Sequence, residues 1–342
     1  DPKTNLKSAN MLWDYWSLNP ESLHQVMILF SDRGTPDGHR FMNGYGSHTF
    51  SMYNKKNERV WVKFHFKTMQ GNRTLTGPQA EELRGKDPDY SQRDLVEAIE
   101  RKDYPKWKLM IQVMTDKQAE KFKWNPFDLT KVWPHKDYPL IEAGIMELNE
   151  IPSNYFAEVE QSAFAPSNIV NGIGLSPDKM LQGRILAYPD AHRYRLGANY
   201  EQIPVNRPIV PVHNHQRDGF MAIDGNGGSA PNYYPNSFDD IEADKDYREH
   251  PMELGSVVAD YWDRNKNDDD HYSQPGVLFR KVMTDQERAN TIANFVGSMK
   301  GVTGPKRKEI LMRQLDHFHK ADKELALKVA EGLGIKYPQA KK

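Results

Sequence analysis

Residues 184–195, RILAYPDAHRYR, say more about the fold and chemistry of this chain than any other stretch. In a helix, residues three and four positions apart share a face, and that face would here carry Arg184, Tyr188, His192 and Arg195. Pro189 would bend the helix because it removes one backbone donor. A guanidinium one turn from a phenol favours the phenolate, and a bound ferric iron would favour it further. On spacing alone, the ordinary interpretation is a surface helix with a solvated basic stripe.

The sequence around this stretch is irregular, whereas the sequence before it shows strands. Residues 150–265 are rich in Pro, Gly, Asn and Tyr and lack clear periodicity. Connections of this length are usually functional or wrap around something. Upstream, alternating apolar residues predict a hairpin with strands over 49–53 and 60–66, and further strands over 107–114 and 144–149.

Helical patterns occupy both ends of the chain. A short helix is predicted within 1–23 and further helices within 78–102. Thr284-Asp285-Gln286-Glu287 is a capping-box sequence that predicts a helix start, and two amphipathic helices follow through 306–333. We therefore predict an α+β fold with three regions: strands and inserted helices over 1–150, the irregular segment with its helix over 151–265, and a helical region over 266–342.

Composition excludes several classes of site. The 46 basic and 47 acidic residues nearly cancel, so no global field points to nucleic acid or to a membrane surface. No apolar run approaches 18 residues, so no transmembrane helix is predicted. The chain has no cysteine, which excludes disulfides, Cys-based metal sites and thiol nucleophiles. A cytoplasmic location is the simplest expectation, with peroxisomes open if the source is eukaryotic.

Other motifs carry little signal. The pairs His213/His215 and His317/His319 have no third ligand near them in sequence and are weak metal signals. No Gly-x-Ser-x-Gly nucleophile elbow and no Gly-rich loop after a strand is present. From the residues alone, the chain is an α+β protein with a long irregular middle.

Several segments, in the same order, resemble the monofunctional haem catalases, and residues 184–193 resemble the proximal haem-ligand signature of that family. The other segments are NPFDLTKVWPH (125–135), NYFAEVEQ (154–161), SPDKMLQGR (176–184), QRDG (216–219) and APNYYPNSF (230–238). The resemblance covers nearly the whole chain and weakens after about residue 245. It fits the smaller-subunit branch, and it implies that the predicted strands form the second half of an eight-stranded antiparallel barrel.

The resemblance implies a haem site and its chemistry. Tyr188 would be the axial ligand of the haem iron, because catalases are known to hold their haem through a tyrosine. Arg184 would be its charge partner, with His48 and Asp178 as a relay behind Arg184. Four further residues would lie at the haem: Phe164, Pro166, His192 and Arg195. The implied activity is the disproportionation of hydrogen peroxide to water and oxygen, in a homotetramer.

The same branch commonly binds NADPH at a separate surface pocket. The matching positions here are His24, Ser31, Arg33, Asn43, Tyr45, Lys67, Trp133 and His135. Arg33 and Lys67 are suited to a 2′-phosphate. Ile28 stands where some relatives carry an aromatic residue, a departure that bears on affinity.

Two family patterns do not occur in this sequence: a distal His followed by Ala-Lys-Gly, and an Asn in a Gly-Asn-Asn-Thr-Pro context. Both normally lie upstream of the position that matches Asp1. We therefore expect the chain to be a segment of a longer catalase and to be inactive alone. A non-catalytic haem-binding or structural remnant is the alternative.

Overall fold

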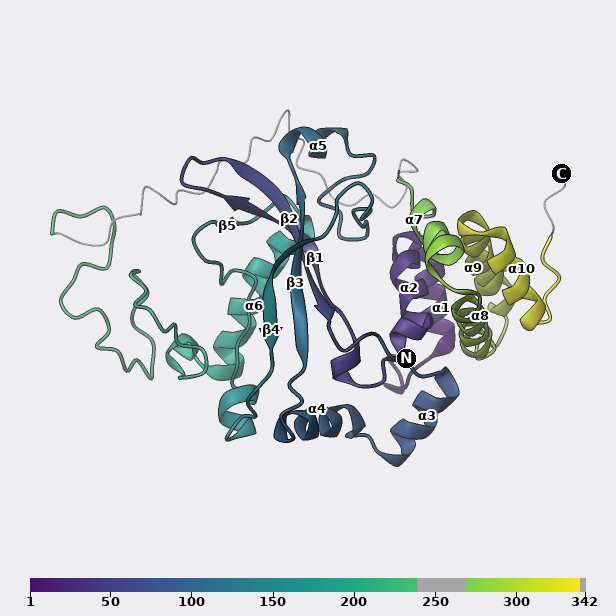
Figure 1. Cartoon of the computed structure of the whole chain (residues 1–342), viewed down its shortest axis with the longest axis horizontal. Coiled ribbons are helices and arrows are strands. Elements are labelled where there is room, and N and C mark those ends of the chain that lie inside the picture. Colours follow the sequence, from purple (N-terminus) through teal and green to yellow (C-terminus); the bar gives the residue numbers. More distant parts are fainter. Residues whose placement is uncertain (239–268, 339–342) are drawn as a thin grey trace.

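The computed structural model describes residues 1–238 and 269–338. At its centre lies an antiparallel sheet of five strands, with α6 along one side and a group of helices on the other (Figure 1). The strand order is β4-β3-β2-β1-β5. The strands are β1 (Gly44–Tyr53), β2 (Arg59–Thr68), β3 (Lys106–Met114), β4 (Ile141–Glu147) and β5 (Ile173–Gly174). The predicted α+β class is confirmed, and the sheet is an open half-barrel.

The predicted hairpin is β1 and β2, joined by a turn in which the Asn54 amide donates to the Glu58 carbonyl oxygen at 3.2 Å. Some strand limits differ from the prediction. β1 begins at Gly44, and β4 spans 141–147 rather than 144–149 because its ladder with β3 starts at the pair of Ile111 and Ile141. β5 was not predicted, since two residues are too few to show alternation.

A bulge interrupts the pairing of β1 with β2. Gly46 pairs with Phe64 and Phe50 pairs with Val62, with a register shift between them. Three residues of β1, 47–49, therefore face the single residue Lys63 on β2. Bulges bend a strand and redirect its side chains. Here the bulge carries His48, which is buried against the segment that leads into α6.

The helices before α6 are α1 (Ala9–Leu18), α2 (Leu23–Phe30), α3 (Gly77–Lys86), α4 (Tyr90–Glu100) and α5 (Asp116–Lys121). Those from α6 onward are α6 (Lys179–Leu196), α7 (Ser273–Val277), α8 (Asp285–Met299), α9 (Arg307–Ala321) and α10 (Lys323–Gly332). The predicted capping box is confirmed: the Thr284 hydroxyl accepts from the Glu287 amide, and the Glu287 carboxylate accepts from the Thr284 amide at 2.7 Å. The short helices α2 and α5 were not predicted.

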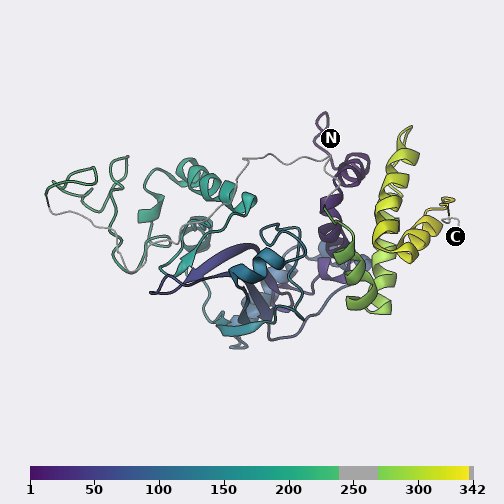
Figure 2. The ribbon, with the colours of Figure 1, turned by 90° about the horizontal axis from the view of Figure 1, so that it is seen from above.

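Helices from opposite ends of the chain share one hydrophobic core. Trp13 of α1 and Phe295 of α8 have ring centroids 6.0 Å apart, and Phe295 and Phe318 of α9 have centroids 4.6 Å apart. All three side chains are fully buried. Figure 2 shows this bundle at one end of the molecule and the chain after α6 at the other. α2 packs into the same core through Leu23, Val26 and Met27, and it contributes to a pocket described below.

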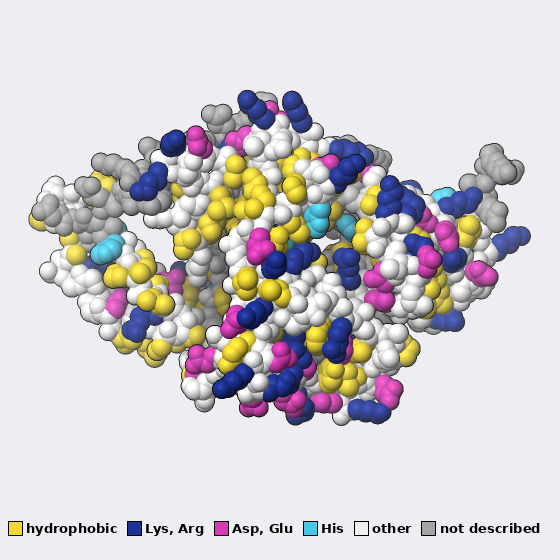
Figure 3. Space-filling view, viewed as in Figure 1, with side chains coloured by type: hydrophobic (Ala, Val, Ile, Leu, Met, Phe, Trp, Pro, Cys, Tyr) yellow, Lys and Arg dark blue, Asp and Glu magenta, His cyan; other side chains and the backbone are white. Residues whose placement is uncertain are grey.

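Residues 203–238 are irregular, as predicted, and residues 239–265 of the predicted irregular segment lie outside the described residues. Hydrophobic side chains lie at the surface of this segment, at the left of Figure 3. They include Ile209, Phe220 and Met221, all almost fully exposed. In the described ranges, no helix is both long and apolar enough to cross a membrane.

Candidate functional site

Asp178 caps the start of α6. One of its carboxylate oxygens accepts hydrogen bonds from the amides of Met180 at 2.9 Å and Leu181 at 3.1 Å. These bonds satisfy two of the amides that a helix start leaves without intrahelical partners. Only 2% of the Asp178 side chain is exposed, so the cap lies inside the protein. The position of the first turn of α6 is thereby fixed.

The other carboxylate oxygen of Asp178 bonds to His48. The His48 Nδ1 lies 2.7 Å from it, and both side chains are buried. Burial alone would raise the pKa of the Asp178 carboxyl, but the hydrogen bonds from His48 and from the two helix amides outweigh burial and lower that pKa. Asp178 is therefore a carboxylate at neutral pH and can only accept a hydrogen bond. The His48 Nδ1 must then carry the proton and donate it to Asp178.

Arg184 and Tyr188 meet on the next two turns of α6, as the spacing predicts. The Arg184 Nη2 donates to the Tyr188 phenol oxygen at 2.9 Å, and the guanidinium carbon lies 4.8 Å from the centroid of the tyrosine ring. The helix continues through Pro189 to Leu196. Within the described residues no hydrogen bond joins His48 or Asp178 directly to Arg184, so α6 itself links the two pairs.

The C-terminal end of α6 holds the loop of residues 160–166 through hydrogen bonds. Arg195 donates to the carbonyl oxygens of Glu160 (2.9 Å) and Ser162 (2.8 Å) and to the His192 Nδ1 (3.2 Å). Because arginine only donates, the His192 Nε2 carries the proton and donates to the Phe164 carbonyl oxygen at 2.9 Å. The Phe164 side chain is nevertheless 83% exposed. Pro166, in the same loop, is half-buried.

A second group of predicted residues meets on the sheet. Tyr45 is the centre of three contacts: its hydroxyl accepts from Asn43 (3.2 Å) and Lys67 (3.4 Å), and its ring lies edge-on to His65, with centroids 5.8 Å apart. The centroids of the His65 and His135 rings are in turn 5.9 Å apart. The structure thus brings together four of the eight residues predicted for the nucleotide, around a histidine that the sequence did not single out.

Gln112 organises this group from β3. Its amide nitrogen donates to the carbonyl oxygens of Trp133 (3.0 Å) and Tyr138 (2.6 Å), so its oxygen is the acceptor toward the His65 Nε2 at 2.9 Å. Burial lowers the pKa of His65 to about 4, so the ring is neutral and its Nδ1 is an acceptor. In the described structure neither this buried Nδ1 nor the buried Trp133 Nε1 has a hydrogen-bond partner.

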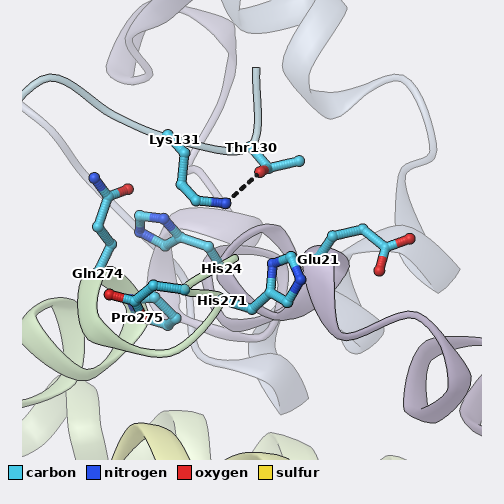
Figure 4. Close-up of a pocket in the computed structure, with 8 residues that line it drawn as sticks. Glu21, His24, Thr130, Lys131, His271, Gln274 and Pro275 are labelled. Carbon is cyan, nitrogen blue, oxygen red and sulfur yellow. Dashed lines mark hydrogen bonds between the residues drawn. The ribbon is translucent and has the colours of Figure 1, made fainter. Parts of the chain in front are cut away.

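His24 lies apart from that group, in a pocket where α2 meets the loop before Trp133 and the start of α7 (Figure 4). The pocket is lined by Glu21, His24, Thr130, Lys131, Asp270, His271, Gln274 and Pro275. Burial, with Lys131 and Arg33 nearby, lowers the pKa of His24 to about 4. Ser31 is buried, and its hydroxyl donates to the Ile28 carbonyl oxygen at 2.7 Å and accepts from the Arg33 amide. Both of these hydrogen bonds of the Ser31 hydroxyl are therefore to residues within three positions in the sequence.

Two family models match the chain. The model described as Catalase matches residues 1–240, which is more than half of the chain. The chain belongs to the catalase family. A second model, described as Catalase-related immune-responsive, matches residues 265–333 of this catalase-family chain.

Individual relatives agree with the family models. The chain is 54% identical to the catalase of the Onchocerca volvulus endobacterium and 54% identical to catalase A of Pseudomonas putida, in each case over 98% of this chain and 68% of the relative. Among solved structures it resembles a bacterial catalase (TM-score 0.88, 40% identity, 98% of this chain and 68% of that one). It also resembles catalase A from Saccharomyces cerevisiae (TM-score 0.90, 40% identity), over 97% of this chain and 69% of that one.

Proposed function

We propose that this protein is a haem catalase that disproportionates hydrogen peroxide to water and oxygen, with Tyr188 as the ligand of the haem iron. The observation that carries the proposal is the Arg184–Tyr188 hydrogen bond of 2.9 Å on a helix whose start is fixed by Asp178, in a chain of the catalase family. The Arg184 guanidinium donates to the Tyr188 phenol oxygen, so a fixed positive group lies against the atom that would bind the iron. A phenolate oxygen is a suitable ligand for ferric iron.

The surroundings of Tyr188 fit a flat apolar group. Phe164, 83% exposed, presents apolar surface beside the helix that carries the phenol. His192 and Arg195 hold the Phe164 backbone at 2.9 Å and the neighbouring carbonyls. When bound, the haem supplies iron that takes up oxidising equivalents from one peroxide and passes them to a second. The chain's own residues hold the Tyr188 oxygen beside Arg184 and position the apolar wall.

Oxygen evolution by the protein expressed from its complete gene tests the proposal. We expect the purified protein to show a Soret absorption band and to release oxygen from hydrogen peroxide. Protein that binds haem but releases no oxygen would instead support a non-catalytic haem-binding role, and protein without a Soret band would support a purely structural one. Both results would contradict the proposed activity.

NADPH is the second cofactor that we propose, at the group around Tyr45 and His65. Among the described residues, the buried His65 Nδ1 is an acceptor without a partner, which supports a ligand there, and the buried Trp133 Nε1 is a donor without a partner in the loop that Gln112 holds. Buried polar atoms without partners are costly, so a bound molecule that satisfies them gains affinity. Lys67 supplies a cation at the edge of the group, with its Nζ 4.8 Å from the centroid of the Tyr45 ring.

Replacement of Lys67 by Met is expected to weaken NADPH binding by about tenfold, because a charge-assisted hydrogen bond is worth roughly 1.5–3 kcal/mol. NADH lacks the 2′-phosphate, so its affinity should change less. Titration with each nucleotide, followed by NAD(P)H fluorescence, measures both. Lys56→Met, on the exposed turn of the same hairpin, is the control and should change neither affinity. Equal losses for NADPH and NADH would contradict a phosphate contact by Lys67.

We also propose a homotetramer. The segment 203–238 carries exposed apolar side chains such as Ile209 and Phe220, and a patch of this kind marks an interaction surface. A second copy of the chain is the partner that the family favours. The division of the chain at residues 150 and 265 remains a prediction.

A further inference from the structure

Three asparagines in this chain are followed directly by glycine, at 43–44, 171–172 and 226–227. Asparagine is a chemically labile residue, and a glycine after it helps because no Cβ hinders the approach of its backbone nitrogen. That nitrogen attacks the asparagine Cγ, and the side-chain amide leaves as ammonia with the glycine proton. Water then opens the cyclic imide at either carbonyl. The products are aspartate and isoaspartate, and in isoaspartate the main chain runs through the side-chain carbons.

Asn171 and Gly172 occupy the two central positions of a β-turn. The Ile173 amide donates to the Val170 carbonyl oxygen at 3.0 Å. The φ of Gly172 is 90° whereas that of Asn171 is negative, which is the pattern of a type II turn. Asn171 is exposed, and within the described structure neither its side chain nor the Gly172 amide takes part in a hydrogen bond. Both reacting groups are therefore free to meet.

The pair at 43–44 is held by the sheet. The Asn43 side-chain oxygen accepts from the Thr68 amide at 3.0 Å, and its nitrogen donates to the Tyr45 hydroxyl at 3.2 Å. Gly44 is the first residue of β1 and pairs with Phe66 of β2. The imide can form only if the side chain leaves both partners and the glycine leaves the ladder.

The pair at 226–227 is held by a neighbouring aspartate. The Asn226 side-chain oxygen accepts from the Asp218 amide at 2.5 Å, and its nitrogen donates to the Asp218 carboxylate at 3.0 Å. The Asn226 amide donates to the Asp224 carboxylate at 3.0 Å. Two side-chain hydrogen bonds must break before either held asparagine reacts, which should slow the reaction at least about tenfold relative to Asn171.

The turn at 170–173 anchors the segment that leads into α6. The Gly172 carbonyl oxygen accepts from the Tyr53 amide at 3.0 Å, and β5 begins at the next residue and pairs with β1. Beyond β5, the Ser176 hydroxyl donates to the Thr49 carbonyl oxygen and accepts from the Asp178 amide at 3.3 Å. A continuous series of hydrogen bonds to β1 therefore joins the turn to the residue that caps α6.

We infer that Asn171 is a site of spontaneous deamidation, and that isoaspartate at this position loosens β5 and the start of α6. Isoaspartate places an additional carbon in the main chain, so the Gly172 carbonyl oxygen and β5 cannot both keep their register with β1. The consequence for peroxide turnover rests on the proposed function. The reaction at Asn171 and its effect on stability concern only residues of this chain.

The first experiment incubates the protein expressed from its complete gene at mildly alkaline pH and follows each asparagine by peptide mapping with tandem mass spectrometry. Labelling with an isoaspartyl methyltransferase identifies the isoaspartate. Asn171 should deamidate at least about tenfold faster than Asn43 or Asn226, because its side chain has no hydrogen bonds to break. Asn171→Gln should abolish the methyltransferase label at this position, since the longer side chain would have to close a larger ring. Equal rates at the three asparagines, or a faster reaction at Asn226, would overturn the inference.

The second experiment measures the urea midpoint of unfolding and oxygen release over the same incubation. Both should fall in the wild type as isoaspartate accumulates, and both should persist in Asn171→Gln. Asn171→Asp is the matched control for charge, because it carries the carboxylate on a normal main chain, and it should stay within about twofold of fresh wild type in turnover.

Equal losses in wild type and Asn171→Gln would show that isoaspartate at this turn does not weaken the protein. A fresh Asn171→Asp variant as unstable as the aged wild type would show that the charge, and not the longer main chain, is responsible, and it too would contradict the inference. A wild type that releases no oxygen at any time would count against the proposed function alone, because the peptide maps and unfolding data do not depend on turnover.

Discussion

Tyr188→Phe is expected to lower peroxide turnover by at least about 100-fold and to reduce haem retention. The substitution removes the phenolate oxygen, so the Arg184 guanidinium loses the acceptor that lies 2.9 Å from it on the same face of α6. Loss of an outer partner of a metal ligand typically costs 10–100-fold, so loss of the ligand itself should cost more. The haem-to-protein absorbance ratio and the initial rate of oxygen release measure the two effects.

Tyr194→Phe is the matched control for this prediction. Tyr194 lies six residues further along α6, is 75% exposed, and donates its hydroxyl to Asp190. Its loss should leave turnover and haem content within about twofold of wild type, as is usual for an exposed side chain. Retained haem with wild-type turnover in Tyr188→Phe would show that another residue binds the iron.

Helical spacing was enough to predict the Arg184–Tyr188 contact, because residues four apart in a helix are neighbours wherever the helix lies. Helical spacing could not distinguish a solvated basic stripe from a functional site. That choice depends on neighbours distant in sequence, such as Phe164, whose backbone is held by His192. Here the resemblance to a family supplied what local physics could not.

The His48–Asp178 pair shows why the rest of the candidate site could not be predicted from the sequence. The two residues are 130 positions apart. They meet because a bulge redirects His48 and a helix cap fixes Asp178. Neither feature leaves a periodic signal. Lys63 and His65 were not predicted either, since in an alternating strand they look like ordinary solvent-facing residues, whereas Lys63 is almost completely buried and its Nζ donates to the Lys131 carbonyl oxygen.

Asp178→Ala is expected to destabilise the protein by roughly 3 kcal/mol at pH 7. A helix cap contributes about 1 kcal/mol, and a buried hydrogen bond to a charged group about 1.5–3 kcal/mol. The substitution removes both, and leaves His48 buried without the carboxylate. Denaturant unfolding at pH 7 measures the loss. Turnover should fall as well, because the first turn of α6 orients Arg184 and Tyr188.

Asp178→Asn separates the two parts of that loss and makes the pH dependence decisive. Asparagine caps helices as well as aspartate does, so this variant should recover about 1 kcal/mol relative to Asp178→Ala while still lacking the charge. The pKa of Asp178 is lower in the folded protein than the value of about 3.9 for a free carboxyl. Its contribution to stability is therefore complete above that value and is lost as the pH falls through the folded pKa. Asp178→Asn should consequently converge with the wild type in acid, whereas Asp178→Ala should stay about 1 kcal/mol less stable because it has no capping oxygen. A constant gap between wild type and Asp178→Asn down to about pH 2, well below the free carboxyl pKa, would mean that Asp178 acts through packing and not through its charge.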